Sequence, residues 1–292
     1  MALCAQGIPP LRVLSVCSGG GGLDVGIRLA APGSRTVCYL EREAPAVAAL
    51  VAGMASGALC EAPVWSDATT FDGRRWRGVV DCVAGGTPCP EFSLANPERK
   101  ATPEERLATA RGSLFCRLVD IADECAAPWL LWENVGGATD ALPLCFAHLA
   151  ASGFTGAWAR VRASDVGASS PRARVFVLAH RDGARLEESR PLRGPLGTSE
   201  GQTSERGGVE MGTYPPGPDD VGLWARVLRA HPYLAPVAPQ PALRRVDDGL
   251  DMVVGGVGRR DSIYLLGNGV VPEQAAAALR LLWPAVHGGM TP

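Results

Sequence analysis

Cys89 lies in a segment whose composition suits the presentation of a reactive thiol. It stands between Pro88 and Pro90 and follows Gly85 and Gly86, just after an apolar run. The prolines restrict the backbone, and the glycines permit close approach of another molecule. Because the thiolate is the nucleophilic form of cysteine, the pattern indicates a candidate nucleophile. An incidental loop thiol is the alternative interpretation.

Glu133 is a candidate general acid. It follows the wholly apolar run Trp129–Trp132. Burial of a carboxyl group at the end of such a strand would raise its pKa and keep a proton available near neutrality. A carboxylate that merely pairs with an arginine would also account for this residue.

Four consecutive glycines, Gly19 to Gly22, follow the apolar run Leu11–Val16. Glycines at a turn from strand to helix let backbone N–H groups approach an anionic ligand at the positive end of the helix. A tight turn without a ligand is the alternative, because the dinucleotide spacing G-x-G-x-x-G is not met. Glu41 follows about 20 residues on, where an acid can bind the two hydroxyls of a ribose. Together these residues favour a nucleoside-containing cofactor.

Short apolar runs that alternate with helical patterns must position these groups. They predict an α/β fold with a largely parallel sheet and helices on both faces, whose ligands lie beyond the carboxyl ends of the strands. The expected strands are Leu11–Val16, Thr36–Leu40, Val79–Ala84, Trp129–Trp132, Ala157–Val161 and Val175–Ala179. The expected helices are Leu23–Ala31, Ala44–Met54, Pro103–Cys125, Asp140–Ala151, Val221–His231 and Pro272–Leu282, and the Gly/Ser/Pro/Glu-rich stretch 193–220 is expected to be a linker or mobile loop.

Composition excludes several classes of protein. The chain has 292 residues, of which 47% are hydrophobic and 20% charged, so it is neither disordered nor fibrous. No apolar run reaches the roughly 18 residues of a membrane span, and the start lacks a secretory pattern, so we expect no membrane partner and a cytoplasmic protein. Nine cysteines without paired close spacing, and four histidines without ligand spacing, predict neither disulfides nor a metal site.

Arginine dominates the basic residues. Of 28 basic residues only Lys100 is a lysine, and the net charge of −2 does not demand a polyanionic partner. Eight arginines against four acids between Trp158 and Gly194 indicate a local basic face, although compositional bias accounts for them equally well. The candidate phosphate contacts are Arg160, Arg162, Arg181 and Arg185.

Taken together, these segments resemble the DNA cytosine-C5 methyltransferase family in their order from Leu11 to Leu282. The segments that carry the resemblance are CSGGGGLD, Glu41, VWSDATTFD, GGTPCPEFS, ENV, RARVF and GNGVVP. The resemblance implies a Rossmann-like fold that uses S-adenosylmethionine. It implies that the cofactor is bound by Cys17, Ser18, Gly19, Gly21, Gly22, Leu23, Glu41, Asp67 and Asn268.

The same resemblance assigns the reaction. Cys89 would add to C6 of a cytosine flipped out of double-stranded DNA, Glu133 would protonate N3, Arg174 would contact O2, and Arg172 would assist. The residues expected to bind the substrate are Pro88, Ser93 and Asn134. No metal is implied, and a monomer is expected. An RNA cytosine-C5 methyltransferase and a noncatalytic DNA-binding relative of the fold are the alternatives.

Three regions are expected along the chain. Residues 1–185 would form the catalytic, cofactor-binding domain, and residues 186–255 a small, atypical target-recognition region with a flexible loop. Residues 256–292 would then return to the catalytic domain.

Overall fold

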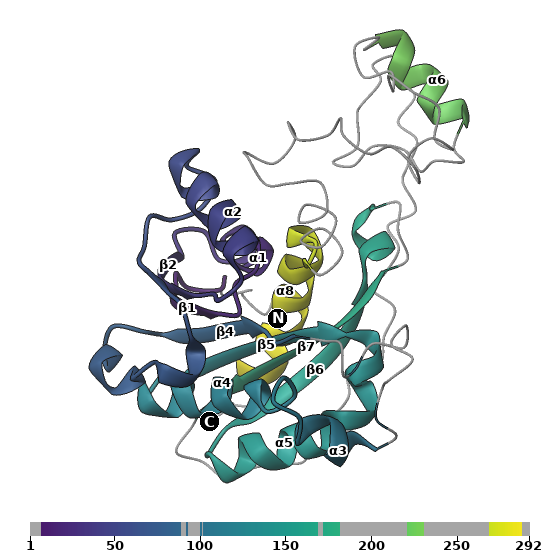
Figure 1. Ribbon diagram of the computed structural model, residues 1–292. Helices are drawn as coiled ribbons and strands as arrows, with labels where there is room; N and C mark the ends of the chain where they lie inside the picture. The colour runs from purple at the N-terminus through teal and green to yellow at the C-terminus, as the bar shows by residue number, and fades with distance from the viewer. Residues whose placement is uncertain are drawn as a thin grey trace, which may run out of the picture.

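The computed structural model describes residues 7–88, 92, 100, 102–168, 172–181, 221–230 and 269–287. Its helices and strands follow one another along the colour gradient of Figure 1. In chain order they are β1 (Arg12–Val16), α1 (Gly22–Ala30), β2 (Arg35–Leu40), α2 (Ala44–Ala55), β3 (Val64–Trp65), β4 (Cys82–Gly86), α3 (Pro103–Leu107), α4 (Leu114–Glu124), β5 (Trp129–Val135), α5 (Leu142–Ala151), β6 (Thr155–Arg162), β7 (Ala173–His180), α6 (Val221–Ala230) and α8 (Pro272–His287). Four short 3-10 helices are η1 (Ala68–Thr70), η2 (Gly73–Trp76), η3 (Gly136–Ala141) and η4 (Ala163–Val166).

Seven strands form one sheet in the order β3-β2-β1-β4-β5-β7-β6. The five strands from β3 to β5 are parallel, which confirms the predicted α/β architecture, whereas β7 is antiparallel to both of its neighbours. The connection from β6 to β7 covers only residues 163–172 and holds η4. A parallel crossover needs a dozen or more residues, so this short connection returns the chain as a hairpin.

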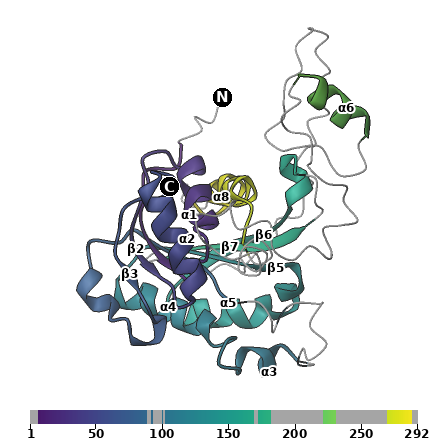
Figure 2. The ribbon, with the colours of Figure 1, turned by 45° about the horizontal axis from the view of Figure 1, so that its top comes forward.

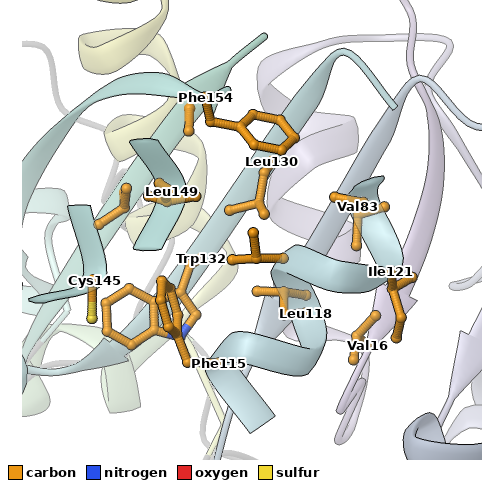
Figure 3. Packing of buried hydrophobic residues seen from close by; sticks show 14 of the residues in the cluster. Val16, Val83, Phe115, Leu118, Ile121, Leu130, Trp132, Cys145, Leu149 and Phe154 are labelled. Carbon is orange, nitrogen blue, oxygen red and sulfur yellow. The ribbon is translucent and has the colours of Figure 1, made fainter. Parts of the chain in front are cut away.

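Helices cover both faces of the sheet (Figure 2). The side chains of β1 alternate, with Val13 packing into the core beneath α1 and α8 and Leu14 into the core beneath α4 and α5. Within the second core, Trp132 of β5 is fully buried and meets Phe115 of α4 edge to face at 4.8 Å between ring centroids (Figure 3). The sheet is thus held from both sides, and its carboxyl edge remains available for ligands.

Asp24 attaches the first turn of α1 to the sheet. Its carboxylate accepts hydrogen bonds from the Ser15 hydroxyl of β1 at 2.9 Å and the Thr36 hydroxyl of β2 at 2.7 Å. Burial raises the pKa of Asp24 to about 6, although both hydroxyls act to lower it. The start of α1, and with it the glycine turn, is therefore fixed by a buried polar cluster.

The C-terminal helix α8 lies beside α1 in both ribbon views (Figures 1 and 2). Close approach is possible because α1 has a glycine at the contact: a Cβ on Gly26 would lie 2.6 Å from both the Ala275 Cβ and the Pro272 carbonyl oxygen. At the far end of α8, Trp283 stacks on Trp129 of β5 with ring centroids 4.1 Å apart. The helix expected over Pro272–Leu282 is confirmed and extends to His287.

The single helix expected over Pro103–Cys125 is wrong, because the chain forms α3 and α4 with a turn between them. The Thr109 hydroxyl donates to the Arg106 carbonyl and accepts from the Gly112 N–H, so it replaces helical backbone pairing. A Cβ on Gly112 would lie only 1.9 Å from the Arg106 carbonyl oxygen, so only glycine permits this turn. Similarly, β4 begins at Cys82 rather than Val79.

Among the described helices none is both long and apolar enough to cross a bilayer. The stretch 193–220 lies outside the described residues, and the division of the chain into three regions stays a prediction.

Candidate cofactor and substrate site

A cavity of about 710 Å³ opens at the carboxyl ends of β1, β2, β4 and β5. This is the edge at which ligands were expected. It brings together segments that are far apart in the sequence. Its lining includes Ser15–Gly20, Gly22, Leu23, Leu40–Glu43, Ala46, Asp67–Thr69, Gly86–Pro88, Ala110, Arg111, Leu114, Glu133–Val135, Arg174, Gly269 and Val270.

The glycine turn between β1 and α1 forms one wall of the cavity. Gly19 and Gly21 adopt positive φ angles of 55° and 79°, and Gly21 is the residue that precedes α1. Gly21 is absent from the lining, and a Cβ on it would lie 2.8 Å from the Leu59 side chain. Cys17 also has a positive φ, 52°, which is uncommon outside glycine. The other expected residues of this turn line the cavity.

Glu41 is held rigidly at the end of β2. Its Oε2 accepts a hydrogen bond from the Gly19 N–H, and its Oε1 accepts from the N–H groups of Arg42 and Glu43, each at 2.8 Å. Oε1 already accepts two hydrogen bonds, so vicinal hydroxyls would reach the group through Oε2, which accepts only one. The geometry fits the ribose of a nucleoside cofactor.

Asp67 lies at the start of η1 and lines the same wall. Its Oδ1 accepts hydrogen bonds from the N–H and the hydroxyl of Thr69, which hold the pKa of Asp67 below its usual value. The carboxylate is therefore charged and fixed at neutral pH, and it can accept a hydrogen bond from an exocyclic amine.

On the opposite side of the cavity, Glu133 and Arg174 form a buried ion pair, with Arg174 Nε 2.8 Å from Glu133 Oε1. Burial raises the pKa of Glu133 to about 7, against the lowering effects of Arg174 and Arg172. The sequence suggested either a carboxyl group with a raised pKa or a carboxylate paired with an arginine. The two are compatible, because Glu133 is paired with Arg174 and can still carry a proton near neutrality.

Because Gly86 has no side chain, there is room beside it for the carboxyl group of Glu133. These two residues are partners in the parallel ladder between β4 and β5. A Cβ on Gly86 would lie 2.9 Å from Glu133 Oε2, closer than such contacts normally come. A side chain here would therefore displace the carboxyl group.

Thr87, immediately after β4, is anchored by two residues of β5. Its hydroxyl accepts from the Trp132 indole N–H at 2.8 Å, and the Asn134 amide lies 3.2 Å from both its hydroxyl and carbonyl oxygens. Pro88, which follows, lines the cavity. Asn134 was expected to bind substrate; it lines the cavity, and in this structure its amide holds the segment that leads to Cys89.

Three expected site residues, Cys89, Ser93 and Asn268, lie outside the described residues. Of the cysteines that the structure describes, only Cys17 lines the cavity. Burial and the nearby charge of Glu41 raise the pKa of Cys17 to about 12, so its thiol stays protonated at neutral pH. Cys17 is thus a poor nucleophile. Within the described residues no group of three or more potential ligands is arranged to hold a metal ion.

Arg172 does not line the cavity, whereas Arg174 does. The Arg172 guanidinium donates a hydrogen bond to the Gly269 carbonyl. Gly269 itself, with Val270, Arg111 and Leu114, lines the cavity without having been expected there. Arg111 precedes α4, and Leu114 is its first residue. The single helix expected over Pro103–Cys125 did not predict a helix start at this position.

Arg181, a candidate phosphate contact, lies away from this cavity, and its role stays a prediction. It follows β7, whose last residue pairs with Trp129 at the start of β5, so it lies at the edge of the sheet opposite the cavity. There its Nη1 is 2.8 Å from Asp123, and its guanidinium lies over the Phe154 ring. Arg160 and Arg162 are exposed on β6, and Arg185 lies outside the described residues.

The fold and the cavity define an α/β protein with a ligand-sized cavity beside a buried carboxyl–arginine pair. Residues 11–206 match the family C-5 cytosine-specific DNA methylase, so the chain belongs to this family.

The chain is also similar to individual proteins of known name. The chain is 30% identical to the type II methyltransferase M.NgoMIV of Neisseria gonorrhoeae over 57% of this chain and 50% of that protein. It is 27% identical to the type II methyltransferase M.NaeI of Lentzea aerocolonigenes over 58% of this chain and 40% of that protein. Among solved structures, a DNMT2 mutant of Spodoptera frugiperda is 20% identical with a TM-score of 0.46, covering 63% of this chain and 55% of that chain. The chain thus spans half or less of the two curated relatives.

Proposed function

We propose that this protein transfers a methyl group from S-adenosylmethionine to C5 of cytosine in DNA. The observation that carries the proposal is a cavity in which the glycine turn and Glu41 face the Glu133–Arg174 pair and the segment leading to Cys89. Two type II methyltransferases among the relatives support DNA as the substrate, and a role in restriction-modification is consistent with their names.

The residues of one wall fit an adenosyl cofactor. Glu41 would accept hydrogen bonds from the ribose hydroxyls, and Asp67 would accept from the adenine amine. Ser18 and the glycines would allow the backbone to approach the ligand closely. When bound, S-adenosylmethionine supplies an electrophilic methyl group.

The residues of the other wall suit an extruded pyrimidine. Cytosine C5 is a weak nucleophile until a thiolate adds to C6. We assign this addition to Cys89, whose sulfur bonds to C6 while the proton of Glu133 moves to N3. C5 would then take the methyl group, with S-adenosylhomocysteine as the leaving group. Loss of the C5 proton to water would let the S–C6 bond break and release the Cys89 thiolate, and return of the N3 proton to Glu133 would restore the ring. Arg174 would contact O2 and, with Arg172, keep Glu133 from being permanently protonated.

Access to C6 requires the cytosine to leave the duplex, at a cost of a few kcal/mol that contacts in the pocket offset. A cavity of about 710 Å³ is large enough to hold both the cofactor and the base.

Trapping on 5-fluorocytosine tests the proposal. Fluorine at C5 cannot leave as a proton, so the covalent adduct persists and migrates as a larger species in a denaturing gel. Plasmid fragments amplified with 5-fluoro-dCTP would supply every sequence context. We expect an adduct with wild type and S-adenosylmethionine, none with Cys89→Ser, and an undiminished adduct with the control Cys60→Ser, because Cys60 lies away from the cavity lining.

Failure of wild type to form an adduct, or an adduct that survives Cys89→Ser, would contradict the proposal. An adduct on 5-fluorocytosine RNA but not on DNA would move the substrate to RNA. Bisulfite sequencing of DNA from expressing cells then reads out the methylated positions.

A further inference from the structure

The segment Gly269–Val270 closes the cavity against the glycine turn. Both residues line the cavity. The Val270 carbonyl lies so near the start of α1 that a Cβ on Gly22 would come within 2.5 Å of its oxygen. The position of this segment therefore helps to set the width of the proposed cofactor site.

Two side chains tie this segment to the ends of β6 and β7. The Arg172 guanidinium donates to the Gly269 carbonyl. In the reverse direction, the Gln274 amide donates to the Arg172 carbonyl at 2.9 Å and to the Val161 carbonyl at 2.7 Å. These three hydrogen bonds link both ends of the stretch 269–274 to the β6–β7 hairpin.

Gln274 occupies a position where an apolar residue would be expected. Its side chain is fully buried, and other buried residues of α8 are small or apolar: Ala275, Ala278, Leu279 and Leu282. Among the described residues the amide oxygen Oε1 has no hydrogen-bond partner, which is costly in a buried site. The contribution of Gln274 therefore comes from its two amide N–H groups, which both donate hydrogen bonds to the β6–β7 hairpin.

We propose that Gln274 and Arg172 are positioning residues that together form a clasp, and that the clasp sets affinity for the adenosyl cofactor by holding Gly269–Val270 against the glycine turn. The inference rests on the proposed function, because it concerns the cofactor assigned there. It gives Arg172 a structural task beside its electrostatic effect on Glu133. Gln274 has no part in the chemistry at Glu133 once the cofactor is in place.

Calorimetric titration with S-adenosylhomocysteine tests the clasp without turnover. Gln274→Leu keeps the volume but removes both donors, and Arg172→Lys keeps the charge but loses the guanidinium fork. We expect Kd to rise about tenfold in each variant, which corresponds to one or two hydrogen bonds. In methyl transfer by Gln274→Leu, we expect KM for S-adenosylmethionine to rise similarly, while kcat at saturation stays within about threefold.

Arg280→Gln is the matched control. It removes a hydrogen bond from α8 to the Leu29 carbonyl at the end of α1 far from the cavity. We expect it to lower Tm without changing Kd. Thermal unfolding of every variant separates loss of folding from loss of binding, and Arg172→Lys provides the measurement if Gln274→Leu does not fold.

The possible failures are distinguishable. If wild type does not bind S-adenosylhomocysteine, the proposed function loses its cofactor. If wild type binds and either clasp variant keeps the same Kd, the clasp is overturned. It is also overturned if Arg280→Gln weakens binding as much as the clasp variants do, because general loosening of α8 would then account for the effect.

Discussion

The pKa of Glu133 is set by burial and by two nearby arginines, which act in opposite directions. Burial favours its neutral form and places its pKa at about 7, while Arg174 and Arg172 favour the charged form. Neither influence alone would suit a group that must hold a proton at N3 and still release it. The balance keeps both forms populated near neutral pH.

The pH profile of kcat at saturating S-adenosylmethionine should show this balance. In the proposed reaction the protonated form of Glu133 is the active one and is lost as pH rises through its pKa, so we expect kcat to fall above about pH 7. In Arg172→Gln the falling limb should move to higher pH, because that arginine lowers the pKa of Glu133. Arg172→Lys, which keeps the charge, should restore the limb; identical limbs in all three proteins would contradict the assignment.

Thr87 positions the segment before Cys89 through hydrogen bonds from Trp132 and Asn134. Thr87→Val keeps the shape but leaves the Trp132 indole N–H unsatisfied in a buried site, at a cost of about 1–3 kcal/mol. We expect the rate of adduct formation on 5-fluorocytosine DNA to fall about tenfold or more, with Kd for S-adenosylhomocysteine unchanged.

Two variants sharpen this prediction. Thr87→Ser retains the hydroxyl and should recover most of the rate, whereas Trp132→Phe keeps an aromatic ring against Phe115 but loses the donor. If Thr87→Ser is as slow as Thr87→Val, the hydroxyl is not the anchor.

Glu133 could be placed at the cavity from the sequence, because a carboxyl group that ends a buried parallel strand lies at the ligand-binding edge of the sheet. Arg172 and Arg174 could not be told apart in this way, since residues two apart share a face of a strand. The structure separates them because β7 begins at Ala173, which leaves Arg172 outside the strand and turned toward Gly269. Such a boundary is set by contacts with β6 and α8, which no local pattern contains.

At the level of elements, the parallel register of β4 and β5 places Gly86 against Glu133. Gly86→Ala would press a methyl group on Glu133 Oε2, at 2.9 Å before relaxation. We expect methyl transfer to fall about tenfold or more, from displacement of the carboxyl group, while Tm changes little.

A double-mutant cycle isolates that contact. Because Glu133→Ala removes the carboxyl group, adding Gly86→Ala to it should cause no further loss of single-turnover rate. An equal loss in both backgrounds would show that Gly86 acts on something other than Glu133.

The elements themselves were predictable to different degrees. The apolar runs located β1, β2, β5 and β7 within a few residues, because buried strands are continuous in hydrophobicity. The direction of β7 depends on the length of its connection, and the break between α3 and α4 depends on Thr109 and Gly112. The apolar spacing of the stretch 103–125 is the same for one helix or two, so only the hydrogen bonds of the turn decide.

At the level of the whole molecule, the first and last described helices complete one core. α8 contributes Ala275, Leu279 and Leu282 to the cluster that α1 builds with Leu23 and Ile27. The glycine turn leads into α1, and the Gly269–Val270 wall of the cavity precedes α8. Their separation therefore affects both the stability of the fold and the shape of the cavity.

Gly26→Ala tests whether the close contact of α1 and α8 determines stability, because the contact decides whether the substitution stabilises or destabilises the protein. In an exposed helix interior, replacing glycine by alanine stabilises by up to about 1 kcal/mol. Here the added Cβ would meet the Pro272 carbonyl oxygen and the Ala275 Cβ at 2.6 Å. Backbone cannot move aside as a flexible side chain can, so we expect destabilisation of about 1–3 kcal/mol in urea unfolding.

The matched control is Gly222→Ala in α6, whose Cβ would meet no atom within 4 Å and should leave stability unchanged or slightly higher. Because α8 starts directly after the Gly269–Val270 wall, Gly26→Ala should also weaken S-adenosylhomocysteine binding in calorimetry, whereas Gly222→Ala should not. Stabilisation by Gly26→Ala would mean that α1 and α8 are not in close contact in solution. Destabilisation with unchanged binding would mean that the cavity wall is held independently of the helix pair.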